Sequence, residues 1–444
     1  MYKHKALALS ILTTLAVSSA RAQTTYTNEP KSDRINSPYT RFGIGNLSDN
    51  RSAALRGMGG IANGYAKEYT INAYNPASYT YLLRTTFEFA FDAQSNNVRI
   101  GDDRTRSNTV TIGHFNLAMP LKKQNLAINI GYMPFSKVYY NSQDSLTIPA
   151  TGDKILQKYN GEGNLNFGYL GISGGAKGFS IGVNGGYVFG NIRNSSYINF
   201  LGTDSLSTRV SDYSQKDIYG GLFFKAGLMY KASLKNNQYI SIGATGTLSQ
   251  RINITRDQYY VAGTQPPYSG APVVTDTVSA VYGQKGKMEL PSEFGFGVHY
   301  GKGASYDFGI DLVYADWSNF KRFGTTESGI GQNAYRVALG GEITPNTKAT
   351  KQYLSAMTYR LGAYMGKDYV YLNNTAINYY GLTLGTQLPL RSNLNTDEQG
   401  GALNLSLDMG NRGTINNGMA SEFFVKFTVG LRINAHWFQR RPYQ

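Results

Sequence analysis

Histidine, serine and aspartate are the residue types in this chain that could support catalysis or metal binding, and their spacing favours neither. Beyond a leader predicted at 1–22, the histidines are His114, His299 and His436. None forms a pair with the short spacing of a zinc site, and the chain has no cysteine. A Ser-His-Asp triad assembles from distant positions, so a phospholipase or protease stays an open alternative. We expect no enzyme, no catalytic residues, no metal and no cofactor.

A glycine-rich stretch at 53–79, AALRGMGGIANGYAKEYTINAYNPASY, has neither helical nor strand periodicity. Glycines this dense permit close backbone approach and turns with positive φ. Everything after the stretch has strand periodicity. We therefore interpret 53–84 as a plug, or hatch, that the strands enclose.

The composition favours an exported membrane protein. Residues 1–22 match a secretory signal peptide, with Lys3 and Lys5 before an apolar stretch and an Ala-x-Ala site at 20–22. No later run approaches the roughly 20 apolar residues of a membrane helix, and the mean hydropathy is −0.34. The chain nevertheless has 35 Tyr, 21 Phe and 51 Gly, which is typical of a transmembrane β-barrel.

Alternating apolar residues predict fourteen strands between residue 87 and the C-terminus. The last is the clearest, because the odd-numbered positions over 423–437 are all apolar. Pro291 interrupts one strand, where we expect a bulge or kink instead of a reversal. The connections alternate between short inner turns and longer outer loops, as barrels of this class require. The predicted strands cover 87–93, 110–121, 126–140, 165–173, 179–189, 218–230, 239–254, 278–300, 306–317, 335–343, 358–365, 377–390, 403–409 and 423–437.

The formal net charge of +15 does not indicate nucleic-acid binding, because the basic residues are scattered and form no block or recognition motif. A solvated lumen and rims that face anionic lipid headgroups explain it. The expected partners are therefore membrane lipid and lipopolysaccharide, and no nucleic acid. Aromatic residues predicted at the membrane interfaces are Tyr314, Trp317, Phe320, Trp437 and Phe438.

Several motifs resemble the FadL/OMPP1 family of outer-membrane transporters for hydrophobic compounds. They are the RGMGG segment at 56–60 with Asn-Pro-Ala at 75–77, LP at 290–291 before FGFG, DLVYADWSNF at 311–320, and YRLGAY at 359–364 before YGL. The resemblance implies a fourteen-stranded barrel with an N-terminal hatch that carries the Asn-Pro-Ala motif. The SPYTRFGIG segment at 37–45 is similar to the Bacteroidota branch, which includes barrels that serve protein secretion. Asp276-Thr277-Val278 also resembles O-glycosylation sites of Bacteroidota.

These observations predict an all-β transmembrane antiparallel barrel of about 14 strands, multi-pass in the cell outer membrane. The expected divisions are a signal peptide (1–22), a periplasmic N-terminal segment (23–52), the hatch (53–84) and the barrel (85–444). The predicted hatch residues are Gly57, Gly59, Gly60, Asn75, Pro76 and Ala77. The residues predicted to contact a ligand, which ordinary plug packing explains equally well, are Met58, Ile61, Tyr65 and Tyr79.

Two functions remain open at this stage. The first is passive uptake of long-chain fatty acids or other hydrophobic small molecules through the hatch and a lateral exit. The alternative is a non-transporting FadL-like barrel that belongs to an outer-membrane or periplasmic protein complex for secretion or assembly.

Overall fold

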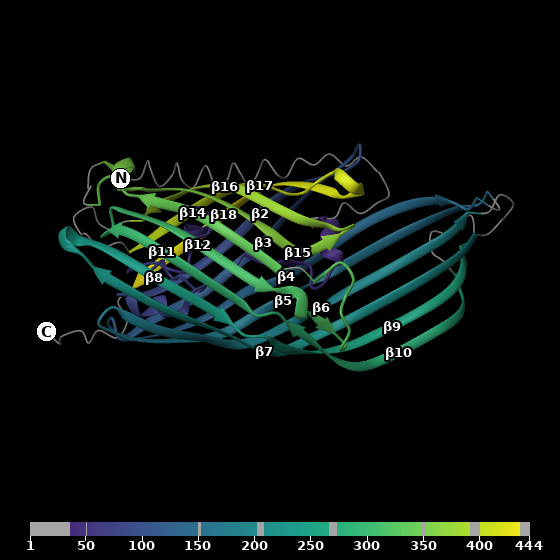
Figure 1. The fold of residues 1–444 in the computed structure, drawn as a ribbon, viewed down its shortest axis with the longest axis horizontal. Helices are drawn as coiled ribbons and strands as arrows, with labels where there is room; N and C mark the ends of the chain where they lie inside the picture. Colours follow the sequence, from purple (N-terminus) through teal and green to yellow (C-terminus); the bar gives the residue numbers. More distant parts are fainter. Residues whose placement is uncertain are drawn as a thin grey trace. The chain divides into compact units, whose positions relative to one another are not determined.

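The wall of the molecule is a closed ring of antiparallel strands (Figure 1). The computed structural model describes residues 36–49, 51–149, 152–201, 208–265, 273–331, 333–347, 352–390 and 400–435. The ring closes where β18 (Ala420–Ala435) pairs with β2 (Thr85–Ile100). Neighbouring wall strands are also neighbours in sequence. The predicted fold class, a 14-strand antiparallel β-barrel, is confirmed.

Two wall strands are each made of two segments. Both β8 (Gln238–Thr247) and β9 (Gln250–Gln265) pair with β7 (Thr208–Ser233), while β10 (Val273–Leu290) pairs with β9 and β11 (Glu293–Lys302) with β8. The second interruption falls at Pro291, as expected for a residue that cannot donate to a ladder. The other wall strands are β3 (Asp103–Lys122), β4 (Leu126–Thr147), β5 (Lys154–Ala176), β6 (Phe179–Leu201), β12 (Tyr306–Asp316), β14 (Asn333–Ile343), β15 (Thr358–Leu372), β16 (Thr375–Pro389) and β17 (Gly401–Gly413).

Short elements lie inside the ring or join its strands. No helix among the described residues is long and apolar enough to cross a membrane. The short elements are η1 (Pro38–Arg41), β1 (Asn46–Leu47), α2 (Ala53–Arg56), η2 (Pro76–Tyr81), η3 (Lys235–Asn237), η4 (Trp317–Asn319), β13 (Lys321–Arg322), α3 (Tyr353–Ala356) and η5 (Asn416–Gly418).

The predicted alternation is clear along β12. Phe308, Ile310 and Leu312 are exposed on the outer face, whereas Asp307 and Asp311 are buried on the inner face. Comparable rows of exposed apolar side chains on the other strands form an outer apolar belt. On the two interrupted strands this belt lies in β8 and β11, so β9 and β10 extend beyond it.

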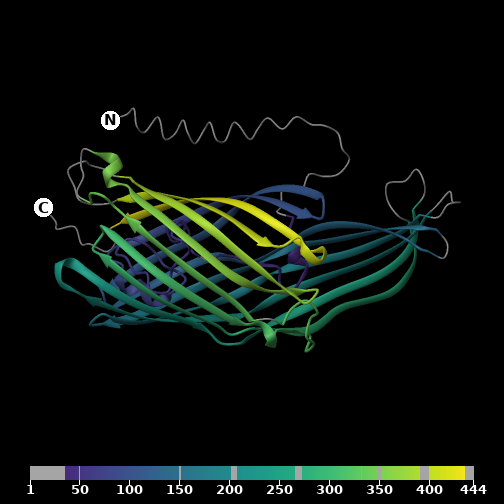
Figure 2. The same cartoon turned by 45° about the horizontal axis from the view of Figure 1, so that its top comes forward.

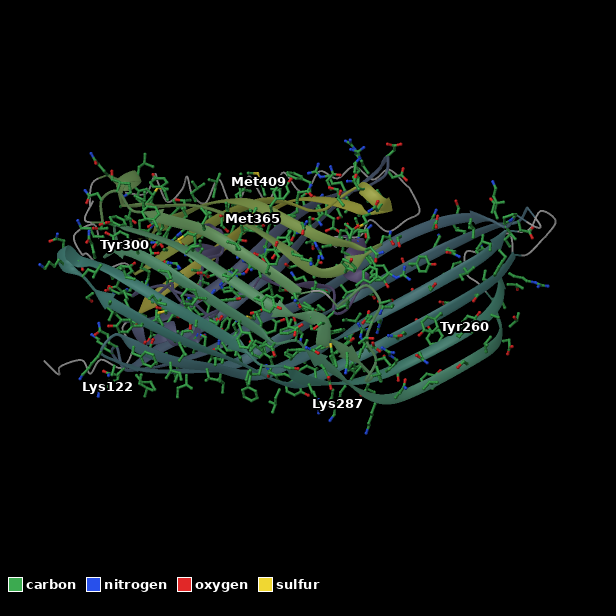
Figure 3. All side chains as sticks on the ribbon, viewed as in Figure 1. Lys122, Tyr260, Lys287, Tyr300, Met365 and Met409 are labelled. Atoms are coloured by element: carbon green, nitrogen blue, oxygen red, sulfur yellow. The ribbon has the colours of Figure 1, made fainter. Side chains whose placement is uncertain are left out.

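Beyond the belt, six strands continue as an outer extension, which we define as the outward halves of β4, β5, β6 and β7 together with β9 and β10 (Figures 1 and 2). β7 is 26 residues long, whereas about 9–11 residues suffice to cross a membrane. Figure 3 places Tyr260 on this extension, away from Tyr300 and Met365 of the barrel wall. The sequence analysis assigns most of this region to loops, and there the structure instead continues the strand pairing.

Because of the apolar belt, we expect the effect of an added charge on the free energy of unfolding to depend strongly on its position. Leu382 of β16 is 61% exposed in the belt, so we expect Leu382→Arg to lower the free energy of unfolding by roughly 2–4 kcal/mol. Phe200, exposed near the end of β6 in the outer extension, is the matched control, and we expect Phe200→Arg to change it by less than about 0.5 kcal/mol. Denaturant titration in liposomes measures both, and equal losses would contradict the belt.

Candidate functional site

Residues 53–84, predicted to form a hatch and called the hatch below, contain short, locally capped elements. Helix α2 begins after Ser52, whose hydroxyl accepts the N–H of Leu55 at 3.5 Å. The 3-10 helix η2 begins after Asn75, whose side-chain oxygen accepts the N–H of Ala77 at 3.1 Å. Pro76 suits the first helical position, where no N–H is needed. The remaining backbone is irregular and depends on the wall for hydrogen bonds.

Glycines on both sides allow the hatch backbone to lie directly on the wall. Gly59 has φ +68°, and a Cβ there would lie 2.7 Å from the carbonyl oxygen of Leu339 in β14. A Cβ on Gly362 of β15 would lie 2.0 Å from the Gly59 nitrogen. Side chains at these positions would push the two backbones apart, so the glycine pattern fixes where the hatch sits.

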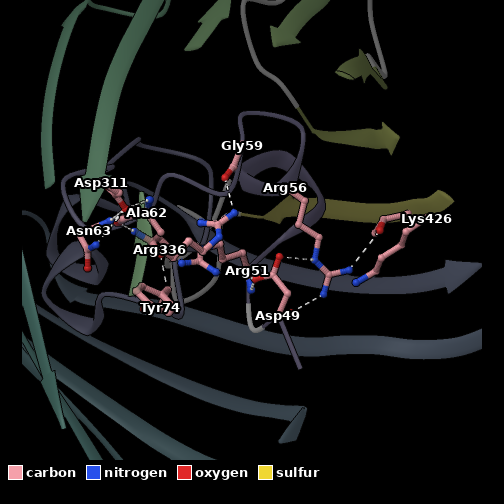
Figure 4. Close-up of polar contacts among 12 residues, drawn as sticks. Asp49, Arg51, Arg56, Gly59, Ala62, Asn63, Tyr74, Asp311, Arg336 and Lys426 are labelled. Atoms are coloured by element: carbon pink, nitrogen blue, oxygen red, sulfur yellow. Dashed lines mark hydrogen bonds and ion pairs between the residues drawn. The ribbon is translucent and has the colours of Figure 1, made fainter. Parts of the chain in front are cut away.

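One wall carboxylate holds the middle of the hatch. The same oxygen of Asp311, in β12, accepts the N–H of Ala62 at 2.6 Å and that of Asn63 at 2.8 Å (Figure 4). The Asn63 side-chain nitrogen donates to it at 3.0 Å. Asp311 is 1% exposed, so water does not compete for these bonds. Charged acceptors bind N–H groups more strongly than neutral ones.

The Asn-Pro-Ala motif lies at a second anchoring point. The side-chain nitrogen of Asn75 donates to the Asn63 carbonyl at 2.5 Å and to the Leu228 carbonyl of β7 at 3.3 Å. Asn75, Pro76 and Ala77 are all buried. The structure thus joins the Asn-Pro-Ala motif to the middle of the hatch and to the wall.

The four residues predicted to contact a ligand are fully buried in packing between hatch and wall. Met58, Ile61 and Tyr65 share one apolar cluster, in which Ala338 of β14 is the wall residue. Tyr79 lies apart, where its hydroxyl donates to Asn184 of β6 at 2.9 Å. None of the four lines the cavity described next, and their contact with a ligand stays a prediction.

A cavity of about 1050 Å³ lies on the outer side of the hatch. Tyr74 and Arg56 are the hatch residues in its lining. The Tyr74 hydroxyl donates to Glu293 at 3.2 Å, and the Lys225 ammonium lies 3.4 Å from the Tyr74 ring centre. The other charged side chains of the lining are Asp49, Arg51, Asp92, Lys137, Glu162, Arg193, Arg336, Lys367, Asp368, Asp408, Arg412, Glu422 and Lys426. The lining thus combines these charges with apolar side chains such as Phe135, Phe223 and Trp317, which suits a ligand that has both polar and apolar parts.

A cluster of arginines connects the hatch to this cavity (Figure 4). Asp49 accepts from Arg51 at 3.0 Å, and Arg56 forms an ion pair with Asp92 of β2 at 2.5 Å. Burial alone would raise the pKa of Asp49, but Arg51 and Arg56 lower it well below its ordinary value, so this carboxylate stays charged. Arg336 donates to the Gly59 carbonyl at 2.6 Å. The sequence alone does not reveal this cluster, because its members come from three distant parts of the chain, at 49–56, 92 and 336.

Residues 36–49 belong to the segment predicted as periplasmic. They lie against the outward half of β4. The N–H of Ser37 donates to the Tyr139 carbonyl at 3.1 Å, and β1 pairs with Ser136 and Lys137. This segment covers a seam in the wall: β3 pairs with β4 only from Phe115 inward. Outward of that point, β3 and β4 pair only with their other neighbours, apart from the contact with β1.

Two interface predictions need correction. Trp317 and Phe320 are buried, and Trp317 lines the cavity with its ring stacked on Tyr369, 3.9 Å between ring centres. The cause is η4, where Asp316 caps the turn and directs the chain inward. Tyr314 is exposed on the outer face, as predicted, while Trp437 and Phe438 fall outside the described residues.

Comparison with known proteins shows which family this chain belongs to. The family model BamG matches residues 5–444. The chain belongs to the BamG family. No curated protein matches it.

This BamG-family chain has the fold of solved FadL-like channels. A *Pseudomonas aeruginosa* FadL homologue is 11% identical, with 87% of this chain and 98% of that one covered and a TM-score of 0.55. The *Ralstonia pickettii* toluene transporter TbuX is 12% identical over 87% and 98%, with a TM-score of 0.54. The *Pseudomonas putida* toluene transporter TodX is 14% identical over 88% and 98%, with a TM-score of 0.52. The likeness confirms the FadL-like fold.

These neighbours are channels, not enzymes. In the described part of the chain, no group of three or more His, Asp or Glu residues could hold a metal ion. His299 instead lies between two carboxylates of β12, with its Nδ1 2.7 Å from Asp307. His436 falls outside the described residues.

We expect the carboxylate of Asp311 to stabilise the hatch against local opening. We expect Asp311→Ala to leave the barrel folded but to raise the hydrogen-exchange rates of the Ala62 and Asn63 amides at least tenfold, because two buried N–H groups lose a charged acceptor. Asp316→Ala is the control on the same strand, since that side chain bonds only within its own turn. Unchanged exchange in Asp311→Ala would contradict the anchoring role.

Proposed function

We propose that this chain is a non-transporting barrel of an outer-membrane protein assembly or secretion machine, in which it binds protein partners. Membership of the BamG family supports this proposal. The observation that carries it is the combination of a tightly packed hatch with an outer extension that a channel of this fold does not need in order to span the membrane.

The packing of the hatch supports a structural role for the lumen. Residues 53–66 are all buried, and Asp311 and Thr383 of the wall accept hydrogen bonds from backbone N–H groups of the hatch. Moving the hatch would break several buried charge-assisted bonds at once, and each costs about 1–3 kcal/mol when a partner is left unsatisfied. A barrel built in this way is a rigid anchor.

The outer extension supports contacts with proteins. Its strands carry exposed aromatic side chains at Tyr213, Tyr259 and Tyr260, beyond the apolar belt. Exposed tyrosines are common in protein interfaces, since they bury a large area with little loss of side-chain entropy. A surface of this kind has no role in the diffusion of a small molecule through the barrel.

Native mass spectrometry of the protein, extracted in mild detergent from its own membrane, tests the proposal. We expect stoichiometric protein partners and no bound mass of fatty-acid size. A single chain that carries such a mass, without protein partners, would overturn the proposal and favour uptake.

Uptake of hydrophobic compounds is the second candidate, and the seam between β3 and β4 favours it. Ile112 and Gly113 on one side of the seam and Pro134 and Phe135 on the other line the cavity. Ile112 is also exposed on the outer face. The seam is therefore the site where an apolar molecule could pass from the cavity into lipid, which avoids about 0.8 kcal/mol of water exposure per CH2.

A cross-link across the seam separates the two functions. The side chains of Thr111 and Lys137 meet across it at 2.8 Å, and the chain has no cysteine, so Thr111→Cys with Lys137→Cys can be bridged by a short bis-maleimide. We expect bridging to leave the uptake of labelled oleate by cells unchanged, with each single variant as control. A tenfold loss of uptake on bridging would support the channel instead.

A further inference from the structure

The outer extension ends in a strand whose outer side has no neighbour. β10 pairs with β9 along its length, and on its other side β13 pairs only with Met288 and Glu289. From Val273 to Gly286 no other strand of the described chain pairs with that side. We call Val273–Gly286 the β10 edge. It presents a row of backbone N–H and C=O groups to the surroundings.

The β10 edge lies outside the membrane. The apolar belt on this strand is formed by β11, where Phe294, Phe296 and Tyr300 are exposed on the outer face. The break at Pro291 separates β11 from β10. In Figure 3, Lys287 lies between the barrel wall and the extension that carries Tyr260. Lipid chains therefore do not cover the edge, and a soluble or surface-held protein segment can reach it.

The edge has few of the charges and prolines that protect free strand edges. Between Val273 and Gln284 the only charge is Asp276, and there is no proline. Val278 is 55% and Tyr282 is 72% exposed. The pairing of β10 with β9 is irregular at three places, between Val274 and Asp276, Thr277 and Ser279, and Val281 and Gln284, so the edge consists of short regular stretches separated by bulges. Edges without charge, proline or a covering segment pair with other chains, so these stretches are open to a partner strand.

The opposite side of the extension shows how this chain covers an edge of its own. There β4 is an edge strand beyond the seam, and the chain's residues 36–48 lie along it. Ser37 and Ser48 donate backbone N–H bonds to β4 at 3.1 and 3.0 Å, and β1 adds two paired residues. One edge is thus covered in part from within the chain, whereas no described strand pairs with the β10 edge.

We propose that the β10 edge receives an extended segment of a different protein by strand addition, which continues the sheet of the outer extension. The proposal rests on the proposed function as a subunit of a protein machine. Backbone pairing supplies the affinity, and alternate side chains on the edge supply selectivity. The exposed Lys285 and Lys287 near the membrane end favour a partner strand with acidic residues at that end and apolar residues opposite Val274 and Val278.

A second copy of this chain does not fit the edge. Copies inserted in one membrane have the same orientation, so both β10 strands run toward the membrane and cannot pair antiparallel. Parallel pairing across a two-fold axis along the membrane normal would require an untilted strand, whereas barrel strands tilt by about 35–45°. The occupant is therefore another protein.

Site-specific photo-crosslinking in the native complex tests the proposal. A photoreactive residue is placed singly at 274, 276, 278 and 280. Position 200, on β6 and away from the β10 edge, is the control. We expect crosslinks to one segment of one partner, in which the crosslinked residue moves in one direction along the segment as the probe moves along β10. Absence of crosslinks, crosslinks without this order, or crosslinks to a second copy would overturn the proposal.

A charge-blocking variant gives an independent readout. We expect Ser279→Lys with Val281→Lys to reduce the amount of the crosslinked partner that co-purifies at least tenfold, while Phe200→Lys retains it. Heat-modifiable migration confirms that both variants fold. Intact mass determines whether Thr277 carries a glycan, and a glycan there would cover the edge and overturn the proposal. If partners co-purify but none contacts β10, the docking surface fails and the proposed function stands; if no partner co-purifies, both fail.

Discussion

An irregular backbone held inside a membrane barrel must find a partner for each buried N–H and C=O group, and this requirement shapes the whole molecule. Unpaired backbone groups away from water cost free energy comparable to a lost hydrogen bond. The hatch makes few internal backbone hydrogen bonds for its length. Asp311, Thr383 and Arg336 on the inner wall supply the missing partners. The polar inner face of the strands is therefore part of the hatch as much as of the barrel.

The same requirement explains why glycines occur on both surfaces. Asp311 and Thr383 of the wall have short side chains. They can accept hydrogen bonds from the hatch only if the two backbones lie close together. Gly59 and Gly362 permit that approach because neither has a Cβ to keep them apart. Packing and polar satisfaction thus depend on each other. A rigid hatch follows from this coupling, since it cannot shift without losing both.

Sequence patterns predicted the parts of this fold that the membrane imposes. Lipid selects apolar side chains at every second residue, so the fourteen strands and the break at Pro291 were visible. Beyond the belt that selection ends, and the outward halves of β5, β6 and β7 lack the period although their backbones stay paired. The arginine cluster was invisible for another reason, since Asp49, Arg56 and Asp92 meet only after the ring has closed. Glycine density located the hatch, but not which of its side chains, Tyr74 above all, would face the cavity.

The two breaks in the wall divide the barrel into regions with different physical constraints. Inward of Leu248–Ser249 and Pro291–Ser292, strands are held by closure of the ring and by lipid on the outer face. Outward of them, β9 and β10 keep the strand direction but leave the ring, so β10 gains an edge that closure would have removed. A continuous strand could not leave the ring at this point without breaking its ladder, and proline removes the donor where the ladder ends. The barrel wall and the surface sheet are in this way parts of the same strands.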